Sequence, residues 1–111
     1  MKQLLFIIIT CMFVFKAYAV SISTKCTSES GRSEYTLNLD TNARDGMIRY
    51  KFMEQDVFYK VIIAKVESGI VEGMAVFEKS NTGEDKGNSF LFKYDLNNNV
   101  FEELNIIAKC D

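Results

Sequence analysis

Apolar and polar residues alternate one by one along most of this chain, and this period of two constrains the fold more than any other feature. Residues 20–26 place four side chains on one face, those of Val20, Ile22, Thr24 and Cys26. Similar alternation returns in residues 34–40, 47–53, 70–78 and 89–95. One apolar face and one polar face are typical of antiparallel strands with a single buried side.

Turn-forming residues separate these segments at regular intervals. They gather at residues 28–33, 41–46, 54–56, 67–69, 80–88 and 96–99, and such clusters mark loops between strands. The pattern predicts an all-β fold: a small antiparallel meander of about seven strands, closed into a barrel or a sandwich.

Two segments leave alternatives open. Residues 57–66 are apolar on both faces except at Lys60 and Lys65, which predicts either a strand covered on both sides or a strand that lines a contact surface. Residues 100–110 place Leu104, Ile106, Ala108 and Cys110 on one face of a strand, which is favoured. The spacing of Phe101, Leu104 and Ile107 would also suit a short helix.

The first 19 residues have the three parts of a cleavable signal peptide: Lys2, an apolar run from Leu4 to Phe15, and the small-residue site Ala17-Tyr18-Ala19. The alternative is a membrane anchor, but the apolar run is shorter than the roughly 20 residues that a spanning helix needs. We therefore expect a signal peptide over residues 1–19 and one β domain over residues 20–111. Export to the periplasm or the medium follows, and the style of the signal and the absence of a glycosylation sequon indicate a bacterial source.

Only Cys26 and Cys110 remain after removal of the signal segment, and an oxidising compartment favours a disulfide between them. Two free thiols, or pairing to another chain, are the alternatives. The bridge would join the first and last strands and close a loop of about 85 residues, which stabilises a small domain by roughly 4–5 kcal/mol in the ideal entropy model.

Charge and missing residue types exclude several functions. Without Lys2 and Lys16, 11 basic residues remain against 15 acidic ones, a net charge near −4, whereas nucleic-acid binding requires a basic surface. The chain has no His, so zinc–imidazole sites and Ser-His-Asp triads are excluded. The sequence predicts no enzyme, no cofactor and no metal site.

Candidate binding residues fall in two places. Phe58, Ile62 and Leu91 lie on the outward faces of their strands, where an exposed apolar patch would mark an interface. The longest polar loop supplies four further candidates, which are Ser80, Glu84, Asp85 and Lys86. These seven residues are the candidate partner-binding residues.

A second hypothesis places the function inside the barrel. The inward faces are rich in aromatic residues: Tyr35, Tyr50, Phe52, Tyr59, Phe77, Phe90, Phe92 and Tyr94. Since a barrel of seven or eight strands is just wide enough to be filled by side chains, a packed core is favoured over a cavity for a small apolar ligand.

The signal, the size, the acidity and the Cys26-to-Cys110 span resemble those of small exported bacterial β-barrels with a terminal disulfide, among them the periplasmic inhibitors of c-type lysozyme. The invasive loop of that family has no clear counterpart here, so the resemblance concerns architecture and carries no site residues. The small stapled barrel, the absence of catalytic residues and the possible apolar face around Phe58, Ile62 and Leu91 predict a non-catalytic exported domain that binds a protein, as an inhibitor or an immunity-type protein. A carrier of a small apolar ligand is the alternative function.

Overall fold

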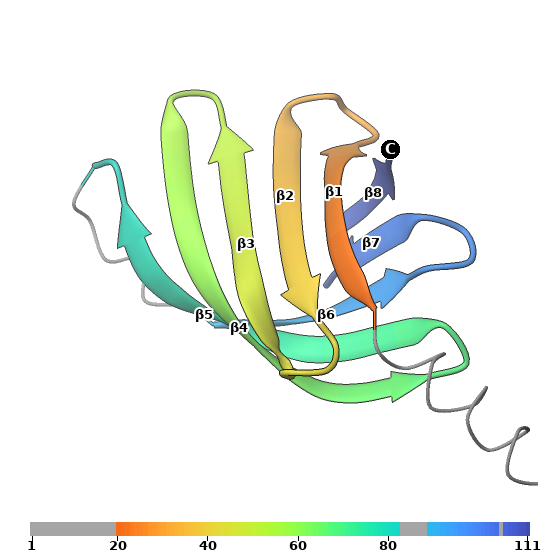
Figure 1. Ribbon diagram of the computed structural model, residues 1–111. Helices are drawn as coiled ribbons and strands as arrows, with labels where there is room; N and C mark the ends of the chain where they lie inside the picture. The colour runs from red at the N-terminus through yellow and green to blue at the C-terminus, as the bar shows by residue number, and fades with distance from the viewer. Residues whose placement is uncertain (1–19, 83–88, 105) are drawn as a thin grey trace, which may run out of the picture.

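Eight antiparallel strands form one closed barrel in the computed structural model, which describes residues 20–82, 89–104 and 106–111. Each strand pairs with the next along the chain, and the last pairs back with the first (Figure 1). The strands are β1 (Ser21–Ser28), β2 (Ser33–Asp40), β3 (Asp45–Phe52), β4 (Gln55–Glu67), β5 (Ile70–Ser80), β6 (Phe90–Asp95), β7 (Val100–Glu103) and β8 (Ile106–Cys110). The predicted meander is confirmed, and it closes as a barrel. Among the described residues, no helix is long and apolar enough to cross a membrane.

The last apolar segment forms two strands where the alternation predicts one. A turn at Leu104 separates β7 from β8, and the backbone of this residue has a positive φ of 48°. The turn removes Leu104 from the face that it was expected to share with Ala108. Ala108 is fully buried, whereas Leu104 is 86% exposed. The helical alternative for this segment is wrong.

The long hairpin of β4 and β5 gives the barrel its bent outline. Ser68 and Gly69 connect the two strands, and both have positive φ, as a tight two-residue turn between antiparallel strands requires. Two shifts of register interrupt their pairing, between Phe58 and Tyr59 and between Ile63 and Lys65. Such bulges bend a strand and increase its twist, and Figure 1 shows both strands curving strongly.

The barrel interior is filled by side chains from every strand. The largest fully buried ones are those of Tyr35, Phe101, Leu37, Ile48, Val61 and Val71. The ring of Phe101 lies 4.7 Å from that of Tyr35 and 5.8 Å from that of Phe92, between ring centroids. The eight aromatic residues predicted to point inward are all buried or half-buried, and the rings in contact indicate a packed core.

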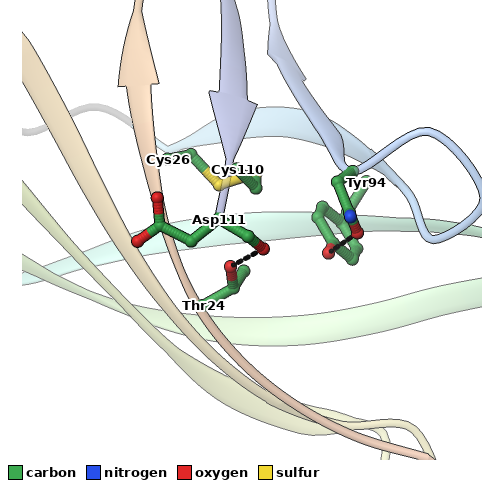
Figure 2. The surroundings of a disulfide bond; sticks show 6 residues. Thr24, Cys26, Tyr94, Cys110 and Asp111 are labelled. Carbon is green, nitrogen blue, oxygen red and sulfur yellow. Dashed lines mark hydrogen bonds between the residues drawn. A yellow bond between two sulfur atoms is a disulfide. The ribbon is translucent and has the colours of Figure 1, made fainter.

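The predicted disulfide joins Cys26 of β1 to Cys110 of β8, two residues 84 positions apart in sequence. They are direct partners in the β1–β8 ladder (Figure 2). The ladder continues past the disulfide, because the amide of Asp111 donates to the carbonyl of Lys25 at 3.0 Å. The Thr24 hydroxyl also donates to the carbonyl of Asp111, at 3.3 Å. The disulfide and these hydrogen bonds complete the closure of the barrel.

Candidate functional site

A row of exposed apolar side chains crosses the outside of the barrel over β4, β5 and β6. Ile62 pairs with Met74 in one ladder, and Met74 pairs with Leu91 in the next, so the three side chains are cross-strand neighbours. Their exposed fractions are 53%, 37% and 71% in that order. The predicted outward positions of Ile62 and Leu91 are therefore confirmed, and the structure places them in one patch.

The row borders a groove of about 650 Å³, called here the outer groove. Its lining comes from β4 to the turn after β7: Ile62, Ala64, Glu72, Gly73, Met74, Leu91, Phe92, Lys93, Glu102 and Leu104. Gly73 is essential for this shape. A Cβ atom there would lie 2.5 Å from the carbonyl oxygen of Ile62 and 3.1 Å from the ring of Phe92, so a side chain at this position would disturb β4 or the core.

Charged residues line one part of the outer groove. Lys93 forms an ion pair with Glu72 at 3.4 Å, and in the neighbouring ladder it lies opposite Glu102. Within the described part of the chain, Glu102 has no ion-pair partner of its own. The groove thus offers an apolar surface with one uncompensated carboxylate, which suits a partner with apolar side chains and a basic group nearby.

Phe58, the third apolar residue predicted for the patch, lies apart from the other two. Its ring is between two cations, with the Arg49 guanidinium 5.2 Å and the Lys79 ammonium 5.1 Å from its centroid. Arg49 also binds Asp56 with two hydrogen bonds, of 2.9 Å and 2.5 Å, and the bond to Arg49 lowers the pKa of Asp56. Phe58 is thus held in a charged cluster at the β3–β4 seam, four positions before Ile62 on the same strand.

The polar loop contributes little that the structure describes. Ser80 is the last residue of β5, and its hydroxyl lies 3.2 Å from that of Thr82. Glu84, Asp85 and Lys86 lie outside the described residues. Asn81, which directly follows Ser80, is fixed to the β3–β4 turn, since its side-chain amide donates to the carbonyl of Glu54 at 2.8 Å.

Of the ten residues that line the groove, only Ile62 and Leu91 are among the partner-binding candidates that the sequence predicts. The alternation places Met74 on the outward face of its strand, but only the register shows that it lies between Ile62 and Leu91. Leu104 is predicted on a strand face because the β-branched run of residues 100–110 and its bridge to the first strand fit a single strand. The neighbouring Asn105 is a turn-favouring residue type and is the one local signal for the turn at Leu104.

No family model, no curated protein and no solved structure matches the chain. The arrangement of the outer groove is therefore the basis for a functional assignment. A shallow apolar surface on a sheet, with a charged margin, is suited to bind another surface.

Proposed function

We propose that this chain is a small exported, non-catalytic domain that binds another protein through the outer groove. One observation carries the proposal: Ile62, Met74 and Leu91 form a continuous apolar row on the outside of a barrel whose interior is already packed. Water-exposed apolar rows are unfavourable for a monomer, and they mark interaction surfaces when they are contiguous and bordered by charge.

Two further features support this function. The Cys26–Cys110 disulfide is compatible with an exported, oxidising location. Ring contacts across the barrel centre, such as that of Tyr35 with Phe101 at 4.7 Å, favour a structural role for the inward aromatic residues. They favour a protein-binding surface over a carrier of an apolar ligand inside the barrel.

The test begins with photocrosslinking in the exported fraction of the source cells. A benzophenone side chain at position 91 should give one defined protein adduct. The same group at position 36, on the outer face of β2, should give none. Adducts of equal yield at both positions would contradict the proposal.

Once crosslinking has identified the partner, its affinity for variants of this domain can be measured. Leu91→Asp and Met74→Asp should each weaken the binding of the partner by about 30-fold, since central apolar residues of an interface contribute about 2 kcal/mol or more. Thr36→Asp is the matched control and should bind normally. Circular dichroism and the melting temperature would establish that the variants are folded. Unchanged affinity in both groove variants would overturn the assignment of this surface.

A further inference from the structure

One end of the barrel is rich in aromatic residues and is called here the mouth. It is the end at which β3, β5 and β7 finish and β4 and β6 begin. Its rings are those of Tyr50, Phe52, Tyr59, Phe77 and Phe90. Tyr50 stacks on Phe52 at 6.4 Å, and Tyr59 meets Phe90 edge-on at 4.9 Å. Tyr59 is buried and the other four are half-buried, so this aromatic surface is partly open to solvent.

A carboxylate points into the mouth. Glu103 is the last residue of β7 and lies two positions after the buried Phe101, on the same inward face. The hydroxyl of Tyr35 donates to its Oε2 at 2.8 Å. Burial raises the pKa of Glu103, although the hydrogen bond from Tyr35 acts in the opposite direction. Burial raises the pKa of Tyr59, and the charge of Glu103 raises it further.

Among the residues that the structure describes, no Lys or Arg forms an ion pair with Glu103, and its Oε1 accepts no hydrogen bond. A half-buried carboxylate without a counter-charge costs free energy. A structural link to Tyr35 alone would not require that charge, because a neutral Gln could accept the same hydrogen bond. The arrangement is suited to a cation that arrives from outside.

The chemistry of the mouth selects the type of cation. Aromatic faces attract cations, and their apolar surface suits an aliphatic stem. A guanidinium is a wide, planar group that prefers both oxygens of a carboxylate in a bidentate pair, whereas at Glu103 the Tyr35 hydroxyl already donates to Oε2 and Oε1 is the oxygen left without a protein partner. A primary ammonium is a compact group that needs only the remaining Oε1 and can satisfy its other protons with tyrosine oxygens or water.

We propose that the mouth binds a primary alkylammonium group, which donates to Oε1 of Glu103 while its aliphatic stem lies against the rings of Tyr50 and Phe90. The ligand is either a free aliphatic amine or a lysine side chain presented by a polypeptide. This site is separate from the outer groove, since Glu103 faces the interior and Leu91 faces outward, and it goes beyond the function proposed above.

The test is a titration of the isotope-labelled mature domain with n-butylammonium and with Nα-acetyl-lysine methylamide, followed by NMR. We expect both amines to bind and to shift the ring resonances of Tyr50 and Phe90. The corresponding norleucine derivative, which lacks the ammonium, should not bind at the same concentration. Tighter binding of the lysine derivative would identify a polypeptide as the source, and tighter binding of butylammonium would identify a free amine.

Two neighbouring carboxylates provide matched variants. Glu103→Gln should weaken amine binding at least tenfold, whereas Glu102→Gln, which removes the same charge from the outer face one residue away, should leave it unchanged. Leu91→Asp should also bind amines normally. Amine binding at the mouth can therefore be tested independently of protein binding at the outer groove. Equal affinity in Glu103→Gln and the wild type would overturn the proposal. So would wild-type ring shifts that map outside the mouth, or an absence of binding by both amines.

Discussion

The two halves of the barrel wall share one inward pattern and differ on the outside. The outer face of β1, β2 and β3 is polar apart from the exposed Met47, with Ser21, Ser23, Lys25, Glu34, Thr36, Asn38, Arg49 and Lys51. The outer face of β4, β5 and β6 carries Ile62, Met74 and Leu91 in one row. Packing of the barrel requires only the inward residues to be apolar. Core packing therefore does not account for the apolar row on the outside, which is the feature on which the proposed binding function rests.

β1, β2 and β3 meet the rest of the barrel wall at two seams of unequal length. β3 and β4 pair over the whole of β3, from Asp45 to Phe52. β1 and β8 pair at Cys26, Thr27 and Ser28, with one further hydrogen bond from Asp111 to Lys25, and the disulfide lies in this short ladder. The short seam therefore depends on the disulfide more than the β3–β4 seam depends on any single contact.

The largest loss of stability should come from removing the disulfide in this short seam. Replacing both Cys26 and Cys110 by Ser should lower the free energy of unfolding by about 3–5 kcal/mol, because the cross-link closes a loop of 84 positions and constrains the unfolded chain. Urea unfolding followed by circular dichroism would measure the loss. Reduced wild-type protein is the control and should behave like the double variant. A loss below about 1 kcal/mol would show that strand pairing alone closes the barrel.

An intermediate loss of stability is expected when either of two closely packed glycines, one in each half of the wall, is replaced by alanine. Gly73→Ala should cost about 1–3 kcal/mol, since the new methyl group meets the Ile62 carbonyl and the Phe92 ring. Gly46→Ala is the counterpart at the β2–β3 pairing, where the methyl group would lie 2.9 Å from Cα of Leu39. Thermal unfolding should show both losses, but only Gly73→Ala should also weaken partner binding at the outer groove. Equal binding by both variants would show that the floor of the groove is not part of the interface.

The smallest effect is on the pH dependence of the free energy of unfolding, and it should have opposite signs for two carboxyl groups, those of Glu103 and Asp56. Burial raises the pKa of Glu103, so its ionised form is disfavoured in the folded state. This cost exists above the folded pKa and disappears as the pH falls through it. Glu103→Gln should therefore stabilise the domain at pH 7, by about 1 kcal/mol or less after solvent screening, and the gain should vanish in acid.

Asp56 should show the reverse behaviour. Its hydrogen bonds to Arg49 lower its pKa, so it contributes stability above its unfolded pKa and loses that contribution as the pH falls through the folded one. Asp56→Asn should destabilise the domain at neutral pH and match the wild type in acid. Melting temperatures of both variants between pH 3 and pH 8 would check the two signs. Parallel curves for the two variants would contradict the assigned causes.

The period of two predicts most of the strands and the side of the wall on which most residues lie, but not the turn at Leu104 that divides the last segment into β7 and β8. Ile62, Leu91 and the inward aromatic residues were placed correctly because a strand fixes alternation locally. Contacts between strands were not predictable in the same way. Phe58 is separated from Ile62 and Leu91 because pairing places it opposite Arg49 and next to Lys79.

The mouth is a second place where contacts between strands could not be predicted from the sequence. Tyr35 and Glu103 form one hydrogen bond across 68 positions of sequence, and nothing near either residue indicates the other. Glu103 also directly follows Glu102 and directly precedes the Leu104 turn. Alternation already places Glu102 and Glu103 on opposite faces of their strand, but only the closed barrel shows that Glu103 meets Tyr35.

The position of the disulfide has a consequence for proteolysis. Cys26 and Cys110 turn nearly the whole domain into a covalent ring, with short tails outside it. A single cut at an exposed turn, such as Met53 or Ser68, would open this ring without releasing a fragment. The cut protein would migrate as one chain until it is reduced, heavier by one molecule of water. A protease would thus need two cuts within the ring to remove any part of the outer groove.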